Sequence, residues 1–468
     1  MTSSAKRARL HQEKTFDGVV FIYLPNEIDA VSAGLLAMVE RGSTTLRSKF
    51  GYGARYLHRS NALAVDPVSL ALAGAVPGNV REEIPVNGLV MFGAIRDASP
   101  DSWGRRVIES KLQVPANSLP ESTYLMQAGS ERFGAIDVRA DRSSGPSGGA
   151  LPPVSELRYL LDAADRIANG EVVPPELQRL FAAGSGLGGA RPKALVTDKG
   201  RMYLAKFPSK GDAFDVPLIE CATLELAREC GLTVPTVRLE ALPDGRNIML
   251  IERFDRLPTL DGKSYTRLHA VSALTMLGLD ESESNTSSYA AIAAATSKHG
   301  GQGIVAADHQ ELFARMVFNI LVSNDDDHLR NHAYVFDPQI RGWRLSPLYD
   351  VVPKPQLSFE RYLHLTVGPR GRQATLENAL EGCRPFGLSP DGAARIMEHI
   401  YSKVRAWRVS FERRGVDPKT CDLVASAFRH GDEVGLKAVR RIVAESNRAR
   451  QAQELIAGST TKSSALDA

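Results

Sequence analysis

The sequence predicts a mixed α/β (α+β) fold, in which a β-rich N-terminal domain is followed by a lobe of β-hairpins and then by a mostly helical lobe. Strand-like apolar runs occupy the N-terminal part of the chain, whereas Ala/Leu-rich stretches with helical periodicity cover residues 267–320 and 388–447. With 468 residues, of which 43% are hydrophobic and 24% charged, the chain can bury the cores of two or three domains.

Composition excludes several classes of protein. Lys plus Arg number 57 against 54 Asp plus Glu, and this small net charge of +3 argues against a histone-like nucleic-acid binder. The four cysteines lack CxxC spacing and are too few for a disulfide scaffold, so we expect reduced thiols in a cytoplasmic protein. No apolar segment follows the basic N-terminus and the longest apolar stretch is interrupted, so we expect neither secretion nor a membrane span.

A run rich in Ser, Gly and Pro at residues 140–153 marks the first expected domain boundary. The C-terminal stretch has the composition of a disordered tail. The expected units are a tail at 1–14, an N-terminal domain at 15–145, a central lobe at 146–260, a helical lobe at 261–447 and a disordered tail at 448–468.

The N-terminal domain is expected to begin with β-structure and to end with a helix. "FDGVVFIYLP" has the pattern of a strand, and we interpret "GARYLHRSNALAVDP" as a second β-type segment. In "DSWGRRVIESKLQ", Asp101 or Ser102 is a candidate N-cap for a helix that carries Trp103, Val107 and Ile108 on one side.

The stretch "GSGLGGARPKA" contains the spacing Gly184-x-Gly186-x-x-Gly189. This spacing alone is a weak signal, and a dinucleotide-binding or Walker A loop would need a helix or a Lys-Ser/Thr pair that does not follow here. A glycine-rich loop beside a β-hairpin, as in kinases that cover ATP phosphates with backbone amides, remains in agreement with the context. The alternative for the glycines alone is a flexible linker.

A hairpin follows, in which "RPKALVT" and "RMYLAKF" are joined by an Asp-Lys-Gly turn. Lys206 stands on its second strand, where Ala205 and Phe207 face the other side. Kinases hold ATP phosphates with such a lysine, which a glutamate of the next helix supports. Glu220 in the predicted helix "VPLIECATLELAREC" is the candidate and Glu225 its competitor, although solvent-exposed side chains would give the same pattern.

The most polar segment of the chain is "LVSNDDDHLRNHAYVF". His328 and His332, with Asp327, could ligate zinc on a helix, but a β-like run begins at once and leaves no helix for that spacing. A hydrated loop is the second interpretation. The third is a phosphotransfer loop, in which Asp326 accepts a proton and Asn331, five positions later, holds Mg²⁺.

A second metal ligand is expected further along the chain. "HAYVFDPQIRGWRLSPLYDVVP" predicts a strand, a turn and a strand before Asp350, which would be the main Mg²⁺ ligand. Taken singly, this aspartate could equally be a turn residue. The argument depends on the order in which glycine loop, lysine, carboxylate, Asp-x4-Asn and final aspartate occur.

These residues resemble the HipA kinases, the toxin halves of bacterial HipA/HipB toxin–antitoxin pairs. The matching pieces are "GSGLGGARPKALV", "LAKFP", "IECATLELARECGLTVP", "IERFDR", "NDDDHLRNHAYVFD" and "LSPLYDVVP", and "MFGAIRDASPDSWGRRVIE" is similar to the end of the family's N-terminal domain. The resemblance implies a two-lobed, protein-kinase-like fold with an ATP-binding N-lobe at 146–260 and a helical C-lobe at 261–447 behind the family's N-terminal domain at 15–145.

The resemblance also implies roles for individual residues. Asp326 would be catalytic, Asn331 and Asp350 would bind the metal, and Glu220 would support the lysine. Ser185 is the candidate for inhibitory autophosphorylation, because a phosphate there would add about −2 charge where the ATP phosphates must lie. The ATP-binding residues would be Gly186, Gly188, Gly189, Lys193, Lys206, Glu252, Phe254, His328, Asn331 and Asp350.

The implied function is an ATP- and Mg²⁺-dependent serine/threonine protein kinase that arrests growth as a toxin. The family suggests an aminoacyl-tRNA synthetase as the protein substrate, a HipB-like helix-turn-helix antitoxin as the partner, and contact with DNA only through that antitoxin. Two alternatives stay open: a small-molecule kinase of the sugar or antibiotic type, and a kinase-inactive protein that binds an antitoxin and DNA.

Overall fold

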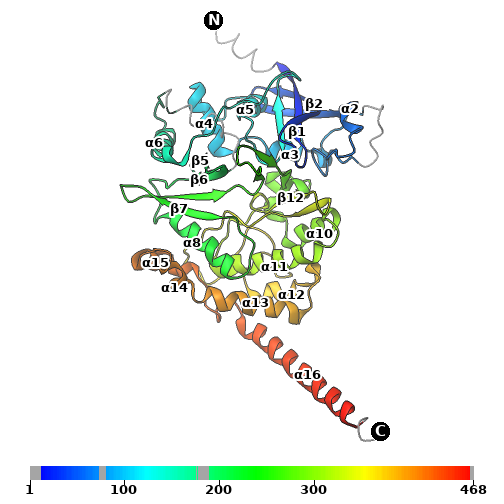
Figure 1. The fold of residues 1–468 in the computed structure, drawn as a ribbon. Coiled ribbons are helices and arrows are strands. Elements are labelled where there is room, and N and C mark those ends of the chain that lie inside the picture. The colour runs from blue at the N-terminus through cyan, green and yellow to red at the C-terminus, as the bar shows by residue number, and fades with distance from the viewer. Residues whose placement is uncertain (1–11, 73–80, 175–176, 178–188, 464–468) are drawn as a thin grey trace.

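The fold is described from a computed structural model, which describes residues 12–72, 81–174, 177 and 189–463. The N-terminal domain is built on a four-stranded antiparallel sheet of order β3-β2-β1-β4 (Figure 1). Its strands are β1 (Glu13–Tyr23), β2 (Ala30–Arg41), β3 (Thr44–Tyr52) and β4 (Ile136–Arg139). Its helices are α2 (Ala54–Leu57), η1 (Val86–Gly88), α3 (Gly93–Asp97), α4 (Ser102–Leu112) and α5 (Glu121–Gln127).

Part of the expectation for this domain is wrong. The segment "GARYLHRSNALAVDP" contains the short helix α2 and no named strand, and the second and third strands lie before it. The capped helix is confirmed, because the Asp101 side chain accepts a hydrogen bond from the Ser102 amide and Trp103 is buried. The first strand begins at Glu13, inside the expected tail.

The central lobe is a second antiparallel sheet, of order β5-β6-β8-β7, between two helices. Its strands are β5 (Lys193–Asp198), β6 (Arg201–Lys206), β7 (Val237–Ala241) and β8 (Asn247–Glu252), preceded by η2 (Val154–Glu156) and helix α6 (Leu157–Ala168) and interrupted by helix α8 (Val216–Glu229). Alternate residues of β8 join different cores: Ile248 and Leu250 pack with α6, whereas Met249 and Ile251 pack in the core that includes α8. This two-residue period decides which side chains reach the site.

The predicted hairpin is confirmed. Lys199 and Gly200 form its turn with φ of 48° and 74°, the left-handed values that a two-residue hairpin turn requires. Ala205 and Phe207 lie in the core beneath α6, so Lys206 points to the opposite face, toward α8.

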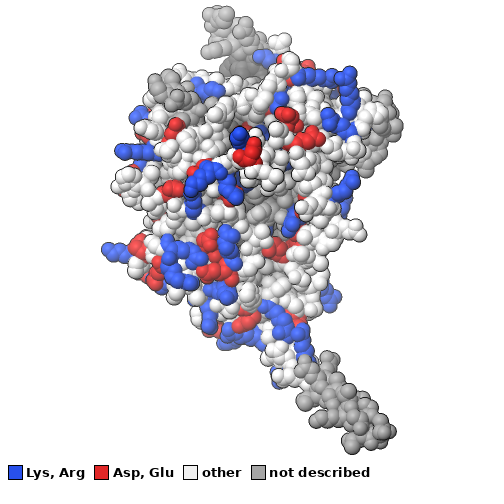
Figure 2. All heavy atoms as spheres, viewed as in Figure 1, with Lys and Arg blue, Asp and Glu red and all other residues white. Residues whose placement is uncertain are grey.

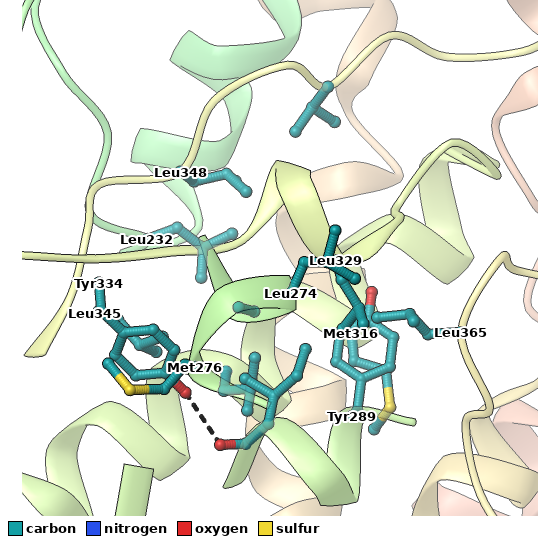
Figure 3. Packing of buried hydrophobic residues seen from close by; sticks show 14 of the residues in the cluster. Leu232, Leu274, Met276, Tyr289, Met316, Leu329, Tyr334, Leu345, Leu348 and Leu365 are labelled. Carbon is teal, nitrogen blue, oxygen red and sulfur yellow. Dashed lines mark hydrogen bonds between the residues drawn. The ribbon is translucent and has the colours of Figure 1, made fainter. Parts of the chain in front are cut away.

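The C-terminal lobe is mostly helical and is organised around the buried helix α11 (Val305–Val322). Figure 3 shows part of this core, to which Leu274, Met316, Leu329 and Leu345 contribute from four different elements, and all four are buried. Leu329 lies inside the aspartate-rich segment, so that segment is anchored in the core.

The other elements of this lobe follow. The strands are β9 (Arg256–Pro258), β10 (Tyr265–Arg267), β11 (Ala270–Ser272), β12 (Ala333–Asp337) and β13 (Gly342–Leu345). The helices are α9 (Ala273–Met276), η4 (Glu281–Thr286), α10 (Tyr289–His299), η5 (Leu329–Asn331), α12 (Leu376–Glu381), η6 (Arg384–Phe386), α13 (Pro390–Val404), α14 (Trp407–Glu412), α15 (Pro418–Val424), η7 (Ala425–Ala427) and α16 (Leu436–Ser463).

Helix α16 projects from the body of the molecule (Figure 1). It continues to Ser463, through most of the stretch at 448–468 that composition assigned to a disordered tail. Within the described ranges, no helix combines the length and the apolar character that crossing a bilayer requires.

Candidate active site

A buried lysine brings three segments together at the base of a cleft between the lobes. The Lys206 ammonium donates hydrogen bonds to Glu220 Oε1 at 2.5 Å and to Asp350 Oδ1 at 2.7 Å. Lys206 ends strand β6, Glu220 lies in helix α8, and Asp350 follows strand β13. The predicted pairing of Lys206 with Glu220 is therefore present, and Asp350 is added to it.

The charges of this group are coupled. The pKa of the Asp350 carboxyl lies far below its usual value, chiefly because of the Lys206 ammonium. Burial alone would lower the pKa of Lys206, but Asp350 and Glu220 outweigh burial and raise it. The Lys206 ammonium therefore faces an ionised Asp350, whose side chain is 39% exposed toward the cleft. Burial raises the pKa of the Glu220 carboxyl, although Lys206 opposes this shift.

Lys193 places a second ammonium beside the first. It pairs with Lys206 in the register of β5 and β6, and both lysines line the cleft. Burial, opposed by Asp350 and reinforced by Lys206, lowers the pKa of Lys193 to about 8. Two cationic side chains at one end of a cleft are suited to binding phosphate oxygens.

The three consecutive aspartates have different surroundings. Asp325 accepts hydrogen bonds from the side chains of Lys354 and Gln356, both at 3.0 Å. Asp327 is buried and accepts from the Tyr289 hydroxyl at 2.6 Å. Asp326 is 78% exposed and faces the cleft, so its carboxylate is the one that a ligand can reach.

Asn331 closes the loop around Asp326. Its side-chain amide nitrogen donates to the Asp326 carbonyl at 2.6 Å, so the spacing of five residues corresponds to a direct contact. His328 caps the short helix η5, because its Nδ1 accepts from the Arg330 amide at 3.2 Å, and its Nε2 lies 3.9 Å from the Asp326 carboxylate. In the part of the chain that the structure describes, no group of three or more His, Cys, Asp and Glu side chains could hold a metal ion.

Aromatic side chains line the other end of the cleft, whose volume is about 940 Å³. The Phe254 ring stacks on Tyr349 at 5.8 Å and meets Phe133 edge-on at 6.2 Å. Glu252 ends strand β8, and its carboxylate forms an ion pair with Arg201 at the start of the neighbouring central strand β6. Phe254 and Glu252, which the resemblance implies are ATP-binding residues, both line this cleft.

The sequence missed several residues of this cleft. Tyr349 directly precedes Asp350, so adjacency could have indicated it. Phe133 and Asp101 come from the N-terminal domain and line the same cleft, but nothing in their local sequence indicates this. Of the residues predicted in the glycine-rich stretch, Gly189 is described, whereas Ser185, Gly186 and Gly188 lie outside the described residues.

Comparisons with known proteins bear on this site. Residues 185–408 match the family described as the HipA-like C-terminal domain. Among curated proteins, the chain is 27% identical to "Putative kinase Y4mE" of Sinorhizobium fredii over 72% of this chain and 79% of that protein. It is 29% identical to a second Sinorhizobium fredii protein, "Putative kinase Y4dM", over 33% of this chain and 37% of that one.

A solved structure shares the fold. It is the HipA protein in a complex of Shewanella oneidensis MR-1 HipA, HipB and operator DNA, and it is similar with a TM-score of 0.63 and 16% identity. The similarity covers 90% of this chain and 97% of that one, so it includes the N-terminal domain as well as both lobes. The expected two-lobed architecture, β-rich at its N-terminus and mostly helical toward its C-terminus, is confirmed.

Proposed function

Since residues 185–408 match the family described as the HipA-like C-terminal domain, we propose that the chain is an ATP- and Mg²⁺-dependent serine/threonine protein kinase. One observation carries the proposal: Lys206, held by Glu220, contacts Asp350 in a cleft that the Asp326 carboxylate also lines. Kinases require this combination of a phosphate-binding lysine, a metal-binding aspartate and a proton-accepting aspartate.

ATP fits the distribution of charge and apolar surface in the cleft. The adenine would lie against Phe254 and Tyr349, whose stacked rings form the apolar end. The phosphates would lie against Lys193 and Lys206 at the cationic end, which Gly189 also lines. Glu252 would lie in the hinge between the central lobe and the helical lobe.

Magnesium fits the donor set that faces the phosphates. The Asn331 amide nitrogen is engaged by the Asp326 carbonyl, which leaves the amide oxygen for a cation, and the Asp350 carboxylate remains ionised. Carboxylate and amide oxygens, completed by phosphate oxygens and water, are the ligands that Mg²⁺ prefers. When bound, the cation would neutralise charge on the β- and γ-phosphates.

The residues of the chain then have distinct tasks in phosphotransfer. The substrate hydroxyl would donate a hydrogen bond to the Asp326 carboxylate, which accepts the proton as the oxygen bonds to the γ-phosphorus. The bond from the γ-phosphorus to the bridging oxygen breaks, and ADP leaves with that oxygen. His328 and Asn331 keep the Asp326 loop in shape, because each bonds the backbone within it.

The biological role that we propose is that of a toxin. The partner would be a HipB-like helix-turn-helix antitoxin, since the similar HipA structure is a complex with HipB and operator DNA. Basic and acidic side chains are interspersed over the face in Figure 2. Contact with DNA would be through the antitoxin. The cytoplasmic substrate would be a protein, with an aminoacyl-tRNA synthetase as the family's suggestion, and Ser185 would be the site of inhibitory autophosphorylation.

The test is transfer of labelled phosphate from Mg-ATP, to the protein itself and to cytoplasmic proteins. Asp326→Asn should lower the rate by about 10²–10⁴-fold, because it removes the proton acceptor, while ATP affinity is retained. Asp325→Asn is the matched control in the same loop, because Asp325 is engaged with Lys354 and Gln356. Equal rates in the wild type and in Asp326→Asn, or growth arrest by both on expression, would refute the proposal.

A further inference from the structure

The described end of the glycine-rich segment is bound by the N-terminal domain. The Gly189 amide donates to Asp101 Oδ2 at 2.9 Å, and the Gly189 carbonyl accepts from the Trp103 amide at 3.0 Å. The Trp103 indole also donates to the Lys193 carbonyl at 2.8 Å. The first turn of helix α4 thus holds both backbone groups of Gly189 and the start of strand β5.

Gly189 is restricted by the same surroundings. Its φ is +91°, in the region that favours glycine, and a Cβ atom there would lie 2.3 Å from Lys193 Nζ. The Gly189 backbone therefore lies close to the Lys193 ammonium, at the point where α4 holds it.

The same carboxylate also contacts the catalytic loop. Arg330 Nη1 lies 3.4 Å from Asp101 Oδ2, and Arg330 Nη2 lies 2.5 Å from Glu281. The Tyr349 hydroxyl donates to the Arg330 carbonyl at 2.7 Å, and Asn331 follows Arg330 in sequence. Arg330 is therefore fixed from three sides, immediately beside a proposed metal ligand.

Asp101 remains charged in this position. Burial alone would raise its pKa, but Arg330 and the Gly189 and Ser102 amides outweigh burial and lower the pKa. An ionised acceptor makes stronger hydrogen bonds than a neutral one, so the contact to Gly189 is not a weak surface interaction.

We propose that Asp101 is a positioning residue of the ATP site, which ties the end of the glycine-rich segment to the catalytic loop through Gly189 and Arg330. The inference rests on the proposed kinase function and adds that the N-terminal domain sets the affinity for ATP. Asp101 itself touches backbone and guanidinium groups, so it acts through them.

The experiment must distinguish the positioning role of Asp101 from a purely structural one, because Asp101 is also the N-cap of α4. Serine is as good an N-cap as aspartate but is one atom too short to bridge Gly189 and Arg330. Asp101→Ser should therefore keep the helix and lose the bridge. The matched control is Glu121→Gln, which breaks the ion pair from Glu121 to Arg105 of the same helix, at 2.5 Å, and leaves Asp101 in place.

The experiment uses the full chain and three measurements. In the nucleotide-free protein, hydrogen exchange of the peptide that contains Gly189 should be faster in Asp101→Ser than in the wild type and in Glu121→Gln. With Mg-ATP, Asp101→Ser should raise KM for ATP by about tenfold, with a smaller change in kcat, because hydrogen bonds to a charged group are lost. Arg330→Gln should raise KM less, and thermal midpoints of Asp101→Ser and Glu121→Gln should be similar.

Two outcomes would overturn the inference. If hydrogen exchange at Gly189 is unchanged in Asp101→Ser, the Asp101 side chain does not hold Gly189. If exchange is faster but KM for ATP is unchanged, the contact between Asp101 and Gly189 does not contribute to ATP binding. A wild type that transfers no phosphate would instead refute the proposed function, and the exchange comparison in the nucleotide-free protein would still decide whether Asp101 holds Gly189.

Discussion

Asp350 combines an unusual backbone with its ionic contact. Its φ is +60°, a left-handed conformation that aspartate tolerates better than most residues because its short polar side chain can bond locally. This conformation accompanies the 2.7 Å contact to Lys206 across a sequence separation of 144 residues. The position of this carboxylate is thus set by the folded chain before any ligand binds, which is typical of functional sites.

Asp327 is the buried counterpart of the exposed Asp326. Besides the Tyr289 hydroxyl, the His364 amide donates to it at 2.7 Å, so the carboxyl joins the aspartate-rich segment to helix α10 and to the chain after Asp350. Burial raises the pKa of Asp327 to about 7, although both hydrogen bonds lower it.

This raised pKa predicts a pH-dependent stability. Between the unfolded value near 3.8 and the folded value of about 7, the native state binds the proton more tightly than the unfolded state. The contribution to the free energy of unfolding is therefore fully present below the unfolded pKa and is lost as the pH rises toward 7. Asp327→Asn cannot titrate, so its thermal midpoint should fall less between pH 5 and pH 8 than that of the wild type. Parallel pH profiles of the two proteins would contradict this.

For individual residues, the sequence predicted those contacts that follow from local periodicity. Lys206 and Glu220 could be paired because a strand alternates its faces and the next helix covers one of them. Spacing also selected Asp326 from three aspartates. The tie between Asp101 and Arg330 could not be found this way, since the two residues are 229 positions apart and each resembles an ordinary surface charge.

Helix α8 shows how local signals fix an element that carries a site residue. Asp215 caps its N-terminus by accepting from the Leu218 amide at 3.0 Å, and Pro217 stands in the first turn. At the other end Gly231 has a φ of +86°, and its amide donates to the Arg228 carbonyl at 2.9 Å. The length of α8, and with it the position of Glu220, is therefore encoded at both ends.

The contribution of the glycine that ends helix α8 can be measured separately, by substitution of Gly231. A Cβ atom there would meet nothing within 4 Å, so Gly231→Ala tests backbone conformation alone. We expect a loss of about 1–2 kcal/mol in the free energy of unfolding by urea, because alanine disfavours positive φ. Gly211→Ala, at an equally open site without positive φ, is the matched control and should change stability little. Equal effects of the two substitutions would contradict the assignment.

Strand β2 and the C-terminal part of helix α16 were not predicted, because their composition gives no clear periodic pattern of apolar residues. Strand β2 reads "AVSAGLLAMVER", where small residues occupy both faces and the alternation of buried and exposed positions is weak. Helix α16 is rich in Arg, Glu, Gln and Ala, which are good helix formers, but the low apolar content beyond residue 447 indicated disorder.

At the scale of the whole molecule, buried charges join the N-terminal domain to the segment around Phe254. Asp255 accepts from the Gly134 amide at 2.8 Å and from Arg253 and Arg256 at 2.7 and 3.0 Å. Arg253 also donates to the Arg132 carbonyl at 2.7 Å. The segment that leads to Phe254 is thus fixed to a domain that precedes the kinase lobes in sequence.

Removing the charge of Asp255 should therefore destabilise the entire chain. The pKa of Asp255 lies far below its usual value, because Arg253 and Arg256 outweigh burial. Asp255→Asn would leave Arg253 without its paired carboxylate and Arg256 with Glu131 alone. We expect a loss of about 3–5 kcal/mol, with a lower midpoint and a broader or split transition in calorimetry. Asp261→Asn, on the exposed turn that follows, is the control and should melt as the wild type does. A single unshifted transition in Asp255→Asn would show that the domains are not coupled here.

The contact of Trp103 with the Lys193 carbonyl has an optical consequence. The chain has three tryptophans, and Trp103 is 1% exposed at the junction of α4 and strand β5. A separation of these elements would wet its indole and shift its emission to the red. With Trp343 and Trp407 replaced by phenylalanine, the emission of Trp103 would report the separation of helix α4 from strand β5, and it could be followed in stopped flow without an added dye.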